Sequence, residues 1–183
     1  MSEIKKIKLY TIGHSNIPMD EFINKLKTRD IKTIVDVRSS PYARYADWFN
    51  GEYLKKELIK NKIKYRWGKS LGGRPEGNQY YLPEGHVNYR KLSESKKYID
   101  ALETLKEEAQ IRNTAIMCSE KKYEDCHRNL LIARTLKNEF DILHIVLDKE
   151  ELEPYKGEPE QATLNIGEEG EQWKSIQPVS QDG

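Results

Sequence analysis

The chain has 183 residues, of which 37% are hydrophobic and 33% are charged, and its mean hydropathy is −0.85. This length suits one domain with its own core and is short for two. No segment approaches the roughly 20 apolar residues of a membrane span, the first residues contain no apolar signal core, and two cysteines are too few for a secreted disulfide framework. We therefore expect a protein of the reducing cytoplasm with no membrane partner.

The net charge of +1 conceals an uneven distribution. Residues 149–183 contain 3 Lys and 9 acidic residues, so this segment carries −6 and residues 1–148 carry +7. A positive body indicates anionic partners, either a small phosphate-bearing molecule or nucleic acid, although a solvated surface rich in Lys and Glu gives the same counts. We predict an α/β domain over 1–148 and an acidic, extended tail over 149–183 that docks on the body through Trp173.

Hydrophobic patterning predicts strands that alternate with helices along the chain. Short apolar or β-branched runs predict the strands, and apolar residues at one-turn spacing predict the helices. A polar loop over 77–88 interrupts the series. In chain order, the predicted elements are a strand at 7–11, a helix from 18, a strand at 31–37, a helix at 51–62, a strand at 63–67, a helix at 89–111, a strand at 114–118, a helix at 124–139 and a strand at 142–147.

The composition of these strands indicates the fold class. They are mostly apolar throughout instead of alternating with polar residues, which is typical of a parallel sheet covered on both faces. We therefore expect an α/β fold with a single open, mostly parallel sheet of about five strands. Helices on both faces would make it a Rossmann-like three-layer sandwich.

Reactive polar residues follow four of the predicted strands, at the edge where open α/β sheets bind their ligands. The helix after the fourth of these strands adds three more reactive residues in its first turns. In chain order, these residues are His14 and Ser15; Asp36, Arg38 and Ser39; Gly72, Gly73 and Arg74; Cys118 and Glu120; and finally Cys126, His127 and Arg128.

Five short motifs contain all of these residues except Arg74: YTIGHS at 10–15, VDVRSSP at 35–41, LGG at 71–73, MCSE at 117–120 and CHR at 126–128. In combination they resemble the domain of unknown function 488 (DUF488) family over about residues 7–148. The resemblance implies an α/β fold and the positions of a site, but no particular reaction. The family often has Asp-Pro before Cys-His-Arg, whereas this chain has Lys122 and Tyr123 there.

Each candidate residue has a functional and a structural interpretation. His14 and Glu120 are candidates for proton transfer or nucleophilic work, or they are loop residues held by their neighbours. Arg38 is a candidate phosphate clamp, or half of a structural ion pair with Asp36. The residues predicted to bind the substrate are Ser15, Asp36, Arg38, Ser39, Gly72, Gly73, Arg74 and Arg128.

The two cysteines suggest further chemistries. Cys126 and His127 lie near a predicted helix N-terminus, which favours a thiolate, so they join His14 and Glu120 as catalytic candidates and Cys126 is expected to be the more reactive thiol. Cys118 ends an apolar strand and is expected to be a buried small side chain. No cofactor is predicted. A zinc site made by Cys118, Cys126 and His127 is the less favoured alternative, because its spacing matches no standard zinc motif.

These observations favour an enzyme that acts on a phosphate-bearing substrate, a nucleotide or nucleic acid. Hydrolysis or transfer at a glycosidic bond is the reaction favoured, because an acid beside a base suffices for it. One alternative is a non-catalytic nucleotide- or nucleic-acid-binding module, in which exposed aromatic side chains stack on bases. The other is thiol chemistry at Cys126 of the sulfurtransferase type.

Overall fold

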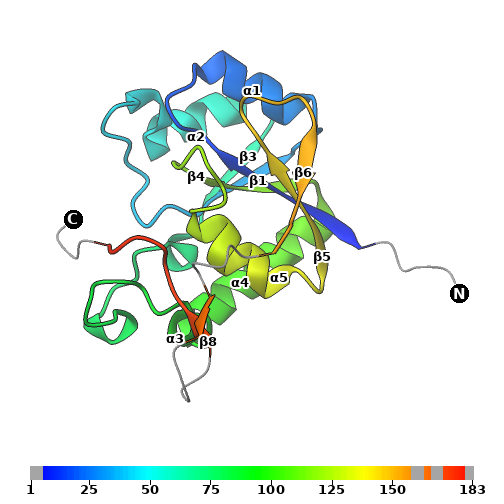
Figure 1. Cartoon of the computed structure of the whole chain (residues 1–183). Coiled ribbons are helices and arrows are strands. Elements are labelled where there is room, and N and C mark those ends of the chain that lie inside the picture. Colours follow the sequence, from blue (N-terminus) through cyan, green and yellow to red (C-terminus); the bar gives the residue numbers. More distant parts are fainter. Residues whose placement is uncertain (1–5, 158–162, 166–170, 180–183) are drawn as a thin grey trace, which may run out of the picture.

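The computed structural model describes residues 6–157, 163–165 and 171–179. Its helices and strands alternate along the chain (Figure 1). The α-helices are α1 (Met19–Lys27), α2 (Gly51–Lys60), α3 (Tyr89–Ser93), α4 (Lys96–Ile111) and α5 (Arg134–Leu136), and a π-helix, η4 (Arg128–Ala133), leads into α5. The 3-10 helices are η1 (Asp47–Phe49), η2 (Lys69–Leu71) and η3 (Asn78–Tyr80). The strands are β1 (Ile7–Gly13), β2 (Thr33–Asp36), β3 (Lys64–Trp67), β4 (Thr114–Cys118), β5 (Phe140–Ile145), β6 (Leu152–Pro154), β7 (Thr163–Asn165) and β8 (Glu171–Trp173).

The main sheet has the strand order β3-β2-β4-β1-β5-β6. All neighbouring strands are parallel except β5 and β6, which are antiparallel. This confirms the expected α/β fold with one mostly parallel sheet, although the sheet has six strands instead of about five. Every residue of β4 is buried, as its apolar sequence predicts for a strand near the centre of the sheet.

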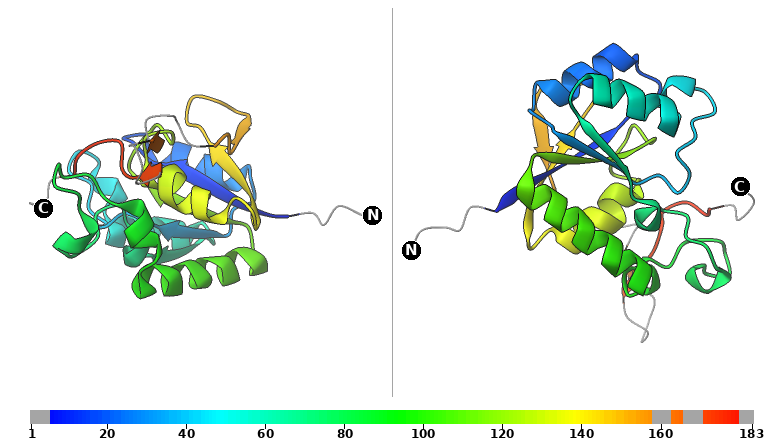
Figure 2. Two further views of the ribbon diagram at one scale, coloured as in Figure 1. Left: turned by 60° about the horizontal axis from the view of Figure 1, so that its bottom comes forward. Right: turned by 180° about the vertical axis from the view of Figure 1, so that it is seen from behind.

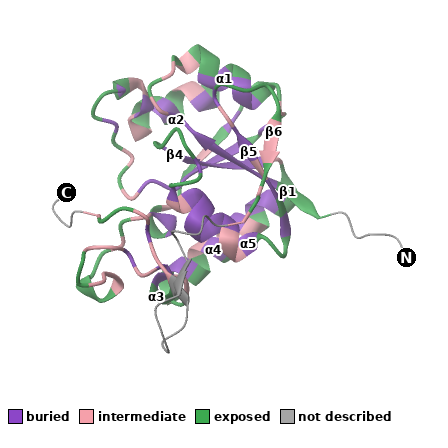
Figure 3. Cartoon of the chain, viewed as in Figure 1, coloured by how far each residue is buried: buried purple, intermediate pink, exposed green. Residues whose placement is uncertain are grey.

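Helices cover both faces of the sheet. The helices α1 and α2 pack on one face, and α4, η4 and α5 pack on the other (Figures 1 and 2). Each face has its own apolar core: Phe22 and Leu54 belong to the first, and Leu102 and Leu131 to the second. Buried residues therefore concentrate in the strands and on the inner sides of the helices (Figure 3). None of the described helices combines the length and the hydropathy that a membrane-spanning helix requires.

Two predicted helices differ from the structure. The helix expected over 89–111 is two helices, because Ser95 begins a new one by accepting a hydrogen bond from the backbone N–H of Tyr98. The helix expected over 124–139 begins only at His127, since the preceding residues form a turn closed by the Cys126 N–H to Tyr123 carbonyl bond.

Several described parts of the segment after residue 148 pair with or contact the body. The strand β6 extends the main sheet, and β7 pairs with β8 in a separate two-stranded sheet. Trp173 docks as expected: its indole N–H donates to the Leu130 carbonyl at 2.7 Å, and Arg134 lies over its ring at 4.5 Å. Residues 158–162, 166–170 and 180–183 of the predicted tail lie outside the described residues.

Candidate functional site

The site lies at the carboxyl ends of β1, β2 and β4, where the parallel hydrogen bonding continues past the strands. The His14 and Ser15 N–H groups donate to the carbonyls of Cys118 and Ser119, both at 2.9 Å, and the Val37 N–H donates to the Met117 carbonyl at 2.9 Å. Ser15 has a φ of 48°, a left-handed conformation that is uncommon for residues other than glycine. These bonds bring three of the predicted motifs to one edge of the sheet.

A thiol–imidazole cluster lies at this edge. The His127 Nδ1 atom lies 3.8 Å from the sulfur of Cys118 and 3.7 Å from the sulfur of Cys126. On the other side of the ring, Nε2 lies 2.9 Å from the Val37 carbonyl oxygen. A ring nitrogen can form a hydrogen bond to a carbonyl oxygen only as an N–H donor, so Nε2 carries the proton. In the neutral ring, the lone pair of Nδ1 therefore faces the two sulfurs. Both thiols are buried and the imidazole is partly buried.

The double-glycine loop packs on this cluster. A Cβ atom added to Gly73 would lie 2.8 Å from the His127 ring, and one added to Gly72 would lie 2.4 Å from the Ser39 hydroxyl oxygen. The Ser39 hydroxyl also accepts a hydrogen bond from the backbone N–H of Arg74 at 2.8 Å. The two glycines are therefore needed for close packing, and they hold the loop against the imidazole.

The two thiols differ in acidity, and the order is the reverse of the one expected from helix position. A hydrogen bond from Cys126 and the nearby His127 hold the pKa of Cys118 well below its usual value. Burial raises the pKa of Cys126, and the neighbouring Cys118 raises it further. The sequence predicted Cys126 to be the more reactive thiol, whereas these directions favour Cys118, because both thiols are buried and a hydrogen bond from Cys126 stabilises the Cys118 thiolate.

A second group of predicted residues forms a buried hydrogen-bond chain. Arg38 forms a two-pronged ion pair with Asp36, with N–O distances of 2.9 and 2.6 Å, and it also donates to the Phe49 carbonyl. The Tyr65 hydroxyl donates to the same carboxylate at 2.9 Å. At the other end of the chain, His14 Nε2 lies 3.2 Å from the Arg38 guanidinium.

His14 has no free ring nitrogen in this arrangement. Its Nδ1 lies 2.6 Å from the Ser15 carbonyl oxygen and must carry the proton, so Nε2 accepts from Arg38. The ring stacks on Phe49 with centroids 4.2 Å apart. Burial and the Arg38 charge lower the His14 pKa to about 4, so the ring is neutral near pH 7.

The family model of the domain of unknown function DUF488 matches residues 18–135, which is more than half of the chain. The chain belongs to the DUF488 family. The match includes the thiol–imidazole cluster, Asp36 and Arg38, whereas His14 precedes it. No curated protein and no solved structure matches the chain.

In this DUF488 domain a buried arginine lies near both the thiol–imidazole cluster and the hydrogen-bond chain of Asp36, Arg38 and His14. Arg128 is 1% exposed and donates to the main-chain carbonyls of Glu120 and Lys121 at 2.8 and 3.3 Å. Its Nε atom has no hydrogen-bond partner within the described part of the chain. A Cβ atom on Gly13 would lie 1.8 Å from the Glu120 carbonyl oxygen and 2.9 Å from Arg128, so only glycine fits beneath this contact.

Glu120 does not join the buried group. It contributes its carbonyl oxygen to Arg128, but the residue itself is exposed. The sequence predicted that His14, Arg38, Glu120 and Arg128 share one site. The structure brings His14 into contact with Arg38 and places Arg128 against Gly13, while the Glu120 carboxylate points toward solvent. The buried pair of Glu120 and His14 expected of an acid–base enzyme is therefore not formed.

Two further polar residues near the site were missed by the sequence interpretation. Tyr65 belongs to the Asp36 network, and its position two residues from the end of a strand was the available signal. His144 is fully buried in β5, with Nδ1 2.8 Å from the Thr11 hydroxyl. Burial and the Arg128 charge lower its pKa to about 3. A histidine inside an apolar strand was the signal for this residue.

Proposed function

We propose that the DUF488 domain is an enzyme whose active site holds a zinc ion between Cys118, Cys126 and His127. The observation behind the proposal is the spacing of the three side chains, whose ligand atoms all lie within 4.8 Å of one another. Zinc–sulfur bonds of about 2.3 Å and zinc–nitrogen bonds of about 2.0 Å place sulfur and nitrogen about 3.5 Å apart on a tetrahedral ion. The two sulfur–nitrogen distances of 3.8 and 3.7 Å are close to this value.

The surroundings of His127 support the same proposal. Metal-binding histidines commonly donate their second ring N–H to a carbonyl or carboxylate, which fixes the tautomer and turns the free lone pair toward the ion. The bond between His127 Nε2 and the Val37 carbonyl is of this kind. The backbone of β2 thus orients the ligand, and Gly73 closes the space beside it.

Three protein ligands leave a tetrahedral ion with one open position, which is typical of catalytic zinc. An ion in such a site polarises a bound oxygen and activates water for hydrolysis or transfer. Around it, Arg38 and Asp36 hold His14 in place, and Arg128 fixes the loop at Glu120 and Lys121. These contacts give the site rigid walls.

We extend the proposal to a phosphate-bearing substrate, a nucleotide or nucleic acid. Residues 1–148 carry a net charge of +7, and Arg74 is exposed directly beside the double-glycine loop. Arg38 and Arg128 are engaged by protein groups, so Arg74 is the arginine of the predicted set best placed to meet phosphate. If the bond cleaved is glycosidic, Glu120 has to supply the proton, because both ring nitrogens of His14 are engaged.

A nucleic-acid-binding module is the alternative that one surface favours. Tyr42 and Tyr45 are 64% and 84% exposed in the loop after β2, and Arg44 lies over the Tyr45 ring at 5.8 Å. Exposed aromatic rings interleaved with cations are typical of surfaces that stack on single-stranded bases. This surface suits a substrate-binding loop of an enzyme equally well.

Thiol chemistry is the second alternative, at Cys118 in place of Cys126. The lowered pKa of Cys118 favours a thiolate there, and His127 is within reach to exchange a proton. Sulfur transfer or redox chemistry would use this thiolate directly, whereas zinc would occupy it.

Metal analysis of the purified protein tests the leading proposal. We expect one zinc per chain, loss of that zinc in Cys118→Ser, Cys126→Ser and His127→Asn, and sulfur-to-cobalt charge-transfer absorption after substitution with Co²⁺. His86→Asn is the matched control, because His86 bonds to the Ser175 carbonyl away from the cluster and should keep its zinc. Protein that is metal-free and fails to bind added zinc rejects the metal centre and leaves the thiol alternative.

A further inference from the structure

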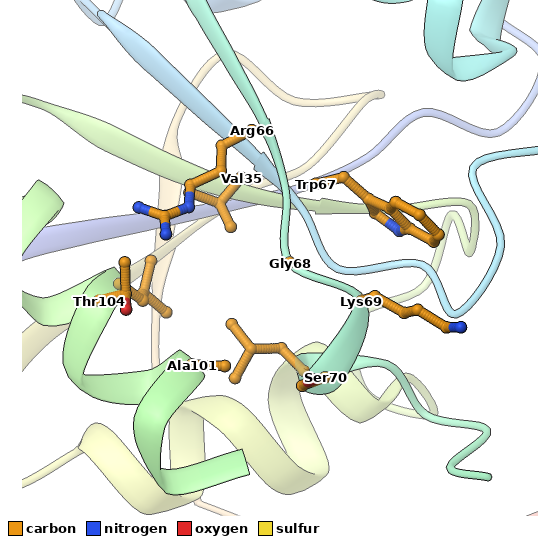
Figure 4. Close-up of a pocket in the computed structure, with 10 residues that line it drawn as sticks. Val35, Arg66, Trp67, Gly68, Lys69, Ser70, Ala101 and Thr104 are labelled. Carbon is orange, nitrogen blue, oxygen red and sulfur yellow. The ribbon is translucent and has the colours of Figure 1, made fainter. Parts of the chain in front are cut away.

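A small cavity lies between β3 and α4, beside the 3-10 helix η2 that leads into the double-glycine segment. It has a volume of about 200 Å³. The strand β3 and the turn after it form one wall, and α4 forms the other (Figure 4). The lining residues are Val35, Arg66, Trp67, Gly68, Lys69, Ser70, Leu71, Ala101, Thr104 and Leu105.

The register of β3 determines which side chains face this cavity. Arg66 pairs with Val35 of β2, so both point to the face of the sheet that α4 covers. On α4, Ala101, Thr104 and Leu105 are three and four residues apart and lie on one side of the helix. In Figure 4 the Arg66 guanidinium and the Thr104 hydroxyl lie on the same side, while Trp67 and Lys69 point away from them.

The charges around the cavity leave one cation available. Lys64 pairs with Glu108 at 2.7 Å, and Lys69 pairs with Glu76 at 2.6 Å. The Arg66 guanidinium has neither an ion pair nor a hydrogen bond to any described residue. Arg66 is exposed, so water satisfies its five N–H groups in the free protein and an anion in the cavity would replace part of that water.

We propose that this cavity binds a small organic anion, with Arg66 holding its oxyanion group and the apolar floor holding its body. A planar guanidinium matches the two oxygens of a carboxylate or a phosphate. Leu71 and Leu105 are buried at the floor and offer apolar contact. The volume is below the range of about 300–1,000 Å³ found for drug-sized ligands, so the anion has only a few carbon atoms.

The cavity adjoins the proposed metal centre through a short piece of backbone. The 3-10 helix η2 lines the cavity, and it leads directly into Gly72 and Gly73, which pack on Ser39 and His127. The inference does not depend on the metal proposal, because Arg66 contacts none of the three thiol–imidazole residues in the structure. A ligand held here would contact the residues that lead into the same loop.

Titration by amide-resolved NMR tests the proposal, with isobutyrate, methyl phosphate and inorganic phosphate as probes. We expect isobutyrate or methyl phosphate to shift the amide signals of Gly68 and Ser70 in a titration that saturates. The probe with the higher affinity shows whether the site prefers a carboxylate or a phosphate. Isobutyramide, which lacks the charge, should not bind. Since a charge-assisted bond contributes about 1.5–3 kcal/mol, Arg66→Gln should weaken binding by about tenfold or more.

Two variants separate the cavity from general charge effects. Ala101→Leu fills the cavity and should abolish binding, while Lys55→Gln removes an exposed cation of α2 and should leave binding unchanged. Repeating the titration on Cys118→Ser should give the same affinity, which distinguishes this site from the metal centre. The proposal is overturned if no probe binds at its highest soluble concentration, or if Arg66→Gln binds as well as the wild-type protein.

Discussion

Gly73 and His127 are in such close contact that a single Cβ atom at residue 73 would lie 2.8 Å from the imidazole ring. His127 cannot retreat freely, because its Nε2 is bonded to the Val37 carbonyl at 2.9 Å. The orientation of the imidazole toward the two thiols is thus fixed from two sides.

The first prediction is that Gly73→Ala lowers zinc affinity without unfolding the protein. The added methyl group pushes the ring and breaks the alignment of Nδ1 with the sulfurs, and disturbing the support of a metal ligand costs about 10- to 100-fold in affinity. Competition with a chromogenic chelator measures this. Gly157→Ala is the control for backbone strain alone, because residue 157 has a φ of 94° but no atom lies within 4 Å of its added Cβ. Equal zinc affinities in the two variants would contradict the role given to Gly73.

The second prediction concerns the order in which the thiols react. After zinc is removed with a chelator, iodoacetamide at pH 7 should label Cys118 faster than Cys126, because the thiolate is the nucleophile and the pKa of Cys118 is the lower one. Peptide mapping by mass spectrometry follows each site with time. Faster labelling of Cys126 would show that the helix N-terminus outweighs the hydrogen bond that Cys118 receives from Cys126.

The third prediction is that Asp36→Asn strongly destabilises the fold. Both Asp36 and Arg38 are almost fully buried, and losing the carboxylate leaves the Arg38 charge without compensation. Breaking a buried pair in this way costs about 3–5 kcal/mol. Urea unfolding at pH 7 measures the loss, and Glu57→Gln, which breaks an exposed pair with Lys60, should leave the midpoint almost unchanged. A loss of similar size in both variants would refute the argument from burial.

The fourth prediction is that acid destabilises the fold through His14. Its pKa is about 4 in the folded protein and about 6.5 when unfolded, so between these values the unfolded state binds more protons. Stability is therefore highest above pH 6.5 and falls as the pH drops toward 4. For His14 alone the loss between pH 7 and pH 5 is about 2 kcal/mol. His14→Gln should show a smaller decrease than the wild-type protein over this range, and parallel curves would exclude this role.

The fifth prediction is that the exposed loop after β2 stacks on nucleobases. If it does, Tyr45→Ala should weaken binding of a single-stranded RNA oligonucleotide by about 5- to 100-fold, since stacking contributes about 1–3 kcal/mol per base. Tyr53→Ala removes a tyrosine that is also half exposed but belongs to α2, and it should have no effect. Fluorescence anisotropy at constant salt compares them. Identical affinities would assign the loop another role.

The sequence predicted the sheet well because its strands are strongly apolar. The bounds of β4 agree with the predicted strand at 114–118, and its complete burial follows from its composition. The strand β6 was missed because Leu152, Glu153 and Pro154 lack both an apolar run and alternation. It forms only because the edge of β5 offers antiparallel hydrogen bonds, and such tertiary pairing has no local signal.

The site was predicted less completely, because the burial of each side chain decides its protonation and its hydrogen-bond partners. The motifs correctly indicated that residues after β1, β2 and β4 meet at one edge. Linear spacing gave no sign that His127 stands between Cys118 and Cys126, since the turn before η4 sets that geometry. Whether Arg38 is free to bind a ligand or is paired with Asp36 likewise depends on the full burial of Asp36, which the sequence does not show.

Trp173 also links the site to the order in which the chain is made. Its indole bonds to the Leu130 carbonyl, inside the helix that begins beside Cys126 and His127, from 43 residues further along the sequence. A ribosome adding roughly 5–20 residues per second leaves this carbonyl without its partner for on the order of seconds. Each newly made molecule therefore passes through a stage in which the residues of this helix have been synthesised but Trp173 has not yet been added to brace them.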